Sequence, residues 1–138
     1  MPVSLHSALV PTWIRILNSS LGWLDKAEAF AKDNGISEAE MMELRLIEDM
    51  LPFNYQIKSM CVHSLGAIEG VRAGSFSPDS TTPPEGFAAL KQRVSETIEK
   101  LSAVDETEME GLIGQTTAFV AGQMRIEFLA ENFLLHFS

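Results

Sequence analysis

Apolar residues at helical spacing organise the first quarter of the chain. Steps of three and four residues separate them, which predicts an amphipathic helix with one buried face. Pro11 must lie in its first turn or kink it, because proline has no amide for the helix ladder. Asn34 and Gly35 tolerate the left-handed cap and are expected to end it. Trp23 lies off the predicted core face and is expected to face a partner or the hairpin. The predicted core face consists of Leu9, Trp13, Ile16, Leu17, Leu21, Leu24, Ala27 and Ala31.

A capping signal predicts a short second helix. Ser37 is followed three residues later by Glu40, the arrangement of a capping box. Pro52 disfavours helical geometry in the residue before it, so we expect a break over residues 48–51. Asp49 is expected to cap the next helix, with Pro52 inside its first turn.

A second amphipathic segment follows this break and is expected to run to about Ala73, where Gly74 ends it. Its residues fall into a central face and a flank beside that face. The predicted face holds Phe53, Gln56, Met60, His63 and Ala67, with Ile57, Cys61 and Ile68 beside it.

The second half of the chain predicts a loop, a helix, a hairpin and the start of another helix. Residues 75–84 hold three prolines and are expected to form a loop. Residues 106–114 are acidic and break the apolar pattern. Two apolar runs, 116–120 and 124–128, flank Ala121-Gly122-Gln123 and predict a small β-hairpin, and residues 132–137 resemble the opening turns of a helix. The third helical face comprises Phe87, Leu90, Val94, Ile98 and Leu101.

Together these elements predict one all-α domain over residues 1–138. We expect an antiparallel four-helix bundle with a small hairpin before a truncated last helix. The apolar end, Phe133 to Phe137, then lacks a partner. Either a second chain supplies the missing side, as in a homodimer, or the natural protein continues through a complete fourth helix.

The charge balance narrows the range of partners. Ten lysine and arginine residues stand against 19 acidic ones, for a formal charge of −9, and no basic patch interrupts them. We therefore expect neither nucleic acid nor a membrane surface as a partner. No secretory leader and no apolar run of about 18 residues occur, so a cytoplasmic location is expected. The single cysteine, Cys61, lies between Met60 and Val62 and is expected to be buried.

Several short stretches, in order along the chain, resemble one known family. They are residues 24–29 (LDKAEA), residues 45–52 (RLIEDMLP) with Tyr55-Gln56-Ile57, and residues 131–137 (ENFLLHF) after the hairpin. These stretches resemble an uncharacterised bacterial and fungal family of the DinB-like (DinB/YfiT) superfamily. The resemblance implies a DinB-like bundle of four antiparallel helices. Many members of that superfamily bind a divalent metal through three histidines, and several are thiol-dependent transferases or isomerases.

Two kinds of site follow as expectations. A zinc or nickel site could use His136, which the resemblance supports, with His63, Asp49 or Gln56. The alternative for His63 is a histidine at the edge of the core whose ring bonds a backbone carbonyl. A ligand-binding cleft is expected around Asp49, Tyr55 and Gln56.

Two functional hypotheses remain open, because no phosphate-binding loop, nucleophile elbow or Cys-x-x-Cys motif occurs. The first is a DinB-like protein that binds a small molecule or a divalent metal between its helices. The alternative is a non-enzymatic helical module that works by oligomerisation.

Overall fold

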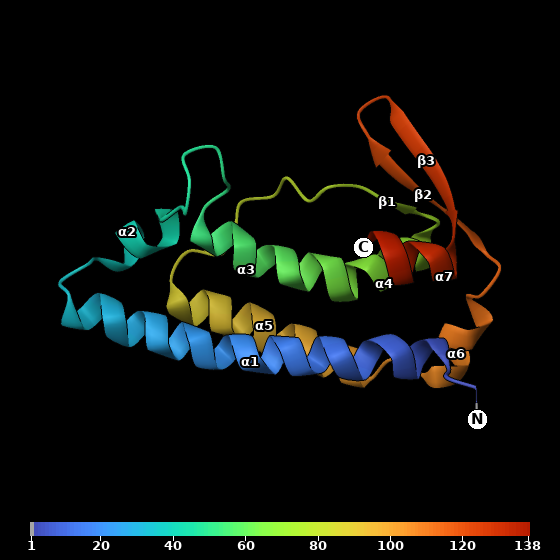
Figure 1. The fold of residues 1–138 in the computed structure, drawn as a ribbon, viewed down its shortest axis with the longest axis horizontal. Helices are drawn as coiled ribbons and strands as arrows, with labels where there is room; N and C mark the ends of the chain where they lie inside the picture. The colour runs from blue at the N-terminus through green and yellow to red at the C-terminus, as the bar shows by residue number, and fades with distance from the viewer. Residues whose placement is uncertain (1) are drawn as a thin grey trace.

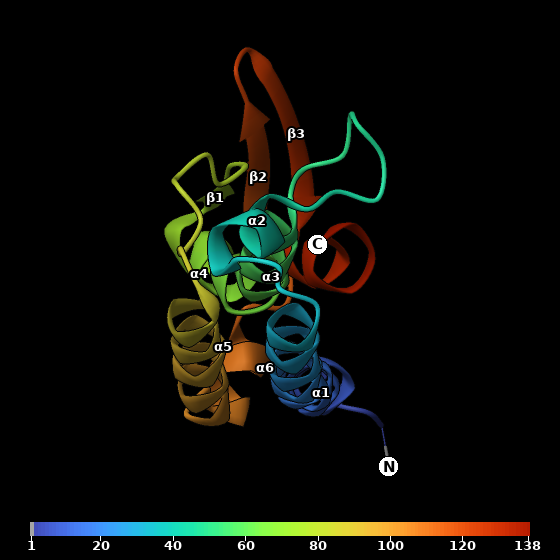
Figure 2. The ribbon, with the colours of Figure 1, turned by 90° about the vertical axis from the view of Figure 1, so that its left-hand side faces the viewer.

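Three long helical segments form the body of the protein in the computed structural model, which describes residues 2–138. They are α1 (Leu5–Asp33), the joined helices α3 (Phe53–Cys61), η1 (Val62–Gly66) and α4 (Ala67–Ala73), and α5 (Phe87–Ser102). Helices α1 and α5 lie side by side, and the joined segment lies above them (Figures 1 and 2).

Helix α1 ends as its sequence predicts but begins earlier, at Leu5. The Ser4 hydroxyl accepts a hydrogen bond from the Ser7 amide at its start, and Asn34 caps its end before Gly35, whose φ is 66°. Pro11, however, lies beyond the first turn. Ile16 is also displaced from the predicted core face, since it is 47% exposed.

The break between the second and third helices is longer than predicted and is capped differently. Helix α2 (Glu38–Glu43) carries the predicted capping box of Ser37 and Glu40, and the chain then leaves helical geometry until Phe53. The predicted cap at Asp49 is wrong, because Pro52 itself occupies the N-cap position, without a side-chain bond. The cause is the early end of α2, which places Asp49 on an exposed turn of a loop instead of beside the new helix.

Residues 62–66 form a turn of π-helix, η1, which the sequence analysis did not predict. It lies inside an otherwise continuous helical segment. That segment ends as predicted at Gly74, which adopts left-handed geometry with φ 81°.

The predicted loop and hairpin form parts of one small sheet. Strand β1 (Ser75–Phe76) begins inside the stretch predicted as a loop and pairs in parallel with β2 (Thr116–Ala121). Strand β3 (Met124–Leu129) pairs antiparallel with β2 as the predicted hairpin, so the strand order is β1-β2-β3. The acidic stretch after α5 contains a further short helix, α6 (Glu106–Gly111).

The end of the chain is helical, as predicted. Helix α7 (Ala130–Asn132) leads into a second π-helical turn, η2 (Phe133–Phe137). The protein is therefore mostly helical with a three-stranded sheet, and not purely α. The antiparallel four-helix bundle with a truncated last helix stays a prediction.

The core lies between the three long helical segments and extends beneath the sheet. Within residues 2–138, no helix combines the length and the apolar character needed to cross a bilayer. The least exposed core side chains are Val10, Leu17, Leu24, Cys61, Ala67, Ile68, Phe87, Leu90, Val94, Leu101, Met109, Ala118, Ala130 and Phe133.

Candidate ligand-binding site

The end of the chain, just after the π-helical turn η2, contacts the π-helical turn η1. The Ser138 hydroxyl donates a hydrogen bond of 3.2 Å to the backbone carbonyl of His63, which joins the end of the chain to η1. A π-helical turn has an extra residue and is often found at functional sites. The region where the end of the chain meets η1 is therefore a candidate functional site.

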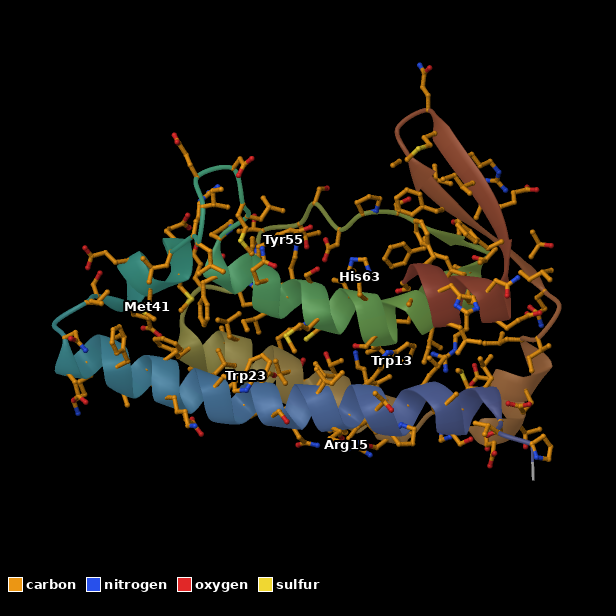
Figure 3. The ribbon with its side chains drawn as sticks, viewed as in Figure 1. Trp13, Arg15, Trp23, Met41, Tyr55 and His63 are labelled. Carbon is orange, nitrogen blue, oxygen red and sulfur yellow. The ribbon has the colours of Figure 1, made fainter. Side chains whose placement is uncertain are left out.

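A pocket of about 250 Å³ borders both turns. Tyr55, Ser59 and His63 line one side of it. They are four residues apart, so they point from successive turns of one helix face. In Figure 3, Tyr55 and His63 both lie on the side of the joined segment that faces away from α1.

Aromatic rings form the opposite wall. Phe76 of β1, Phe119 of β2 and Phe137 of η2 all line the pocket. Their rings contact one another: the centroids of Phe119 and Phe137 are 5.0 Å apart, and those of Phe76 and Phe119 are 6.4 Å apart. The His63 ring centroid lies 5.6 Å from that of Phe76. The sheet and η2 thus supply apolar, stacking surface to a pocket whose helical side is polar.

A buried lysine lies at the base of the pocket. Lys58 is 2% exposed, and its Nζ donates to the carbonyls of Thr81 at 2.6 Å and Asp79 at 3.3 Å. The same Nζ lies 3.4 Å from Asp79 Oδ2 and 4.9 Å from the centre of the Tyr55 ring. These contacts satisfy the ammonium group and hold residues 79–81 over α3.

The Asp79 carboxylate also lines the pocket and is held in its charged form. Partial burial raises its pKa, but hydrogen bonds from the Thr81 hydroxyl and amide, with the Lys58 charge, outweigh this effect. The net result is a pKa below the ordinary value.

The structure brings Tyr55 and His63 together but places the other predicted site residues elsewhere. Gln56 donates to the Leu51 carbonyl at 3.0 Å and lines a separate apolar groove. Asp49 is exposed in the loop between α2 and α3, and His136 is exposed on η2. The predicted cleft of Asp49, Tyr55 and Gln56 is therefore divided between different surfaces.

Of the predicted metal ligands, His63 lines the pocket and His136 is exposed on η2. His63 and Asp79 border the same pocket. Within residues 2–138, no group of three or more histidine, cysteine, aspartate or glutamate side chains is arranged to hold an ion. We assign no chemistry to a metal, and the zinc or nickel site stays a prediction.

Three kinds of site residue were missed by sequence reasoning. Ser59 could have been predicted, because it lies four residues from both Tyr55 and His63 and therefore on the same helix face. No pattern in the sequence pointed to Lys58, because its partners, Asp79 and Thr81, are distant in sequence. The aromatic wall could not be foreseen either, because Phe76 was assigned to a loop.

A second, polar cleft of about 430 Å³ lies between α4 and α5, with Cys61 among its lining residues. The predicted burial of Cys61 is confirmed, since it is 2% exposed. Burial raises the pKa of its thiol, although the neighbouring Thr97 side chain and the Arg93 charge act in the opposite direction. A buried thiol of raised pKa is a poor nucleophile, so Cys61 is a packing residue.

The comparisons with known proteins agree with part of the resemblance noted from the sequence. A search of curated proteins found no match. A family model described as "Domain of unknown function (DUF1993)" matches residues 5–138, which is nearly the whole chain. The chain therefore belongs to the DUF1993 family of uncharacterised proteins.

Proposed function

We propose that this protein binds a small organic molecule in the pocket between α3, η1, the sheet and η2. The observation that carries the proposal is the division of that pocket into a polar side, made by Tyr55, Ser59 and His63, and an aromatic wall. Ligand sites commonly combine mostly apolar walls with a few convergent polar groups. Placement within the DinB-like superfamily, where such bundles bind ligands between helices, is part of this proposal.

The size and lining of the pocket restrict the ligand. At about 250 Å³, it is slightly below the range typical of drug-sized ligands. The wall of Phe76, Phe119 and Phe137 favours a flat ring, because aromatic rings stack or meet edge to face. Ser59 and His63 can donate or accept a hydrogen bond on the other side. The best candidates are therefore small aromatic compounds with one hydrogen-bonding group.

Phenol and benzoate are suitable probes, since both have one ring and they differ in charge. We expect either compound at millimolar concentration to shift the backbone NMR signals of Ser59, His63 and Phe137. Ser59→Leu should abolish these shifts, because the larger side chain fills the pocket. Ser95→Leu is the matched control, since Ser95 is exposed on α5 and does not line the pocket.

Two results would contradict the proposal. One is the absence of any shift around the pocket with either probe. The other is a set of shifts that persists in Ser59→Leu. Repeating the titration with one equivalent of zinc or nickel tests the metal prediction separately, because metal binding at His63 and His136 would broaden or move their ring signals without an organic probe.

A further inference from the structure

Helix α1 carries a second apolar stripe that the rest of residues 2–138 leaves about half exposed. Val10, Leu17, Leu24 and Ala31 form its buried stripe. Ile16, Trp23 and Phe30 also repeat every seven residues, yet they are 47%, 53% and 55% exposed. A helix with two apolar stripes normally has a neighbour on each. We call Ile16, Trp23 and Phe30 the outer stripe.

An apolar groove lies beside the outer stripe. It has a volume of about 510 Å³, and Trp23 borders it on the α1 side. The loop between α2 and α3 borders the other side, where Leu46 is 92% exposed and Ile47 is 64% exposed. Figure 2 shows this loop and the C-terminal turn on the same side of α3. The groove is lined by Trp23, Leu44, Arg45, Leu46, Met50, Leu51, Phe53, Gln56, Ile57 and Met60.

The lining of the groove differs in charge from the whole chain. None of the side chains that line the groove is acidic, although the formal charge of the chain is −9. Two acidic residues of α1, Asp25 and Glu28, are paired with Lys91 of α5 at 2.7 and 2.5 Å. A second acidic chain would meet no carboxylate in the groove lining itself.

Arg45 is the one charged residue in the groove lining. Its guanidinium donates to the Met50 carbonyl at 2.9 Å, and within residues 2–138 it forms no salt bridge. Glu48 and Asp49 are exposed immediately after Leu46 and Ile47. The loop thus presents two apolar side chains followed by two carboxylates, which complement an apolar groove that contains an arginine.

We propose that a second copy of this chain covers this face, so that the protein forms a two-fold homodimer through the groove and the outer stripe. The groove and the protruding loop lie on the same face. A two-fold (isologous) contact requires this, because each copy must contribute both a groove and a loop. The Leu46–Ile47 loop of one copy would pack into the groove of the other, with Glu48 or Asp49 beside the other copy's Arg45. The dimer would also bury Trp23, an anchor residue typical of interfaces.

Sedimentation equilibrium over a concentration series tests the proposal. We expect a species of twice the chain mass of 15.2 kDa. Leu46→Glu should weaken dimerisation at least tenfold, since it puts a carboxylate into the apolar contact. It should not affect folding, because Leu46 is almost fully exposed. Trp23→Glu should have the same effect from the α1 side.

The matched control is Ile113→Glu, an exposed apolar residue that lies after α6 and does not line the groove. This variant should remain a dimer. A monomeric wild type at 100 µM would overturn the proposal, whether the groove is empty or holds a small molecule or another helix. So would a dimer whose affinity is unchanged by both Leu46→Glu and Trp23→Glu.

Discussion

The ammonium of Lys58 on α3 joins that helix to Asp79, 21 residues later, through both the carbonyl and the carboxylate of Asp79. The lysine is 2% exposed, although its side chain belongs to the residue type that is least often buried. Its hydrogen bonds fix the segment between β1 and α5, which forms part of the rim of the ligand pocket. Lys58 therefore connects the stability of the fold to the shape of the candidate site.

Lys58→Met should destabilise the protein by about 2 kcal/mol. The apolar side chain has nearly the same length, but it leaves the carbonyls of Asp79 and Thr81 without their buried donor. Urea unfolding measured by circular dichroism gives the change in the free energy of unfolding. Lys100→Met, at an exposed position of α5, should change it by less than about 0.5 kcal/mol. Equal effects of the two substitutions would show that the Lys58 contacts contribute nothing to stability.

The lowered pKa of Asp79 predicts a stability difference that depends on pH. Because the folded-state pKa lies below the unfolded value, near 3.8, the charged carboxylate stabilises the folded protein above that pH. This contribution is lost as the pH falls through the lower, folded-state value. The free energy of unfolding of the wild type should therefore exceed that of Asp79→Asn at pH 6, and the difference should shrink below pH 4. A difference that grows on acidification would contradict this assignment.

Two glycine-to-alanine substitutions should have opposite effects. At Gly70 an added Cβ would lie 2.9 Å from Phe76 Cβ, where β1 packs against α4, so we expect a loss of about 1–2 kcal/mol. At Gly22, inside α1, an added Cβ meets nothing within 4 Å, so alanine should stabilise the helix by about 0.5–1 kcal/mol. Thermal unfolding at one protein concentration measures both. A stabilising Gly70→Ala would mean that β1 can move away from α4 without loss.

The helices were largely predictable because their signals are local. The periodicity of α1 and its end at Asn34, the capping box of Ser37 and the glycine end at Gly74 depend on residues within a turn or two of one another. Two predictions were wrong because they depended on a neighbouring element. The cap at Asp49 depended on where α2 ends, and the loop from Ser75 depended on whether this segment pairs with β2. Strand β1 has two residues, and only its pairing with β2, more than 40 residues later, makes it a strand.

The candidate site could be predicted only in part, for the same reason. Tyr55 and His63 share a face of one helix, so their proximity follows from their spacing. Phe76, Phe119 and Phe137 come from three different elements, and no local pattern brings their rings together. Gln56 and Asp49 are near Tyr55 in sequence, yet helix geometry and the long loop turn them toward other surfaces.

By itself, the sequence determined the long helices, the hairpin, the burial of Cys61 and the apolar character of the chain's end, because each depends on composition or on short-range periodicity. Tertiary structure alone decided which apolar stripe of α1 is buried, how Lys58 holds residues 79–81, and where three phenylalanines meet the polar face of α3 and η1. Those features depend on contacts between residues far apart in sequence, and such contacts exist only once the helices and the sheet have packed.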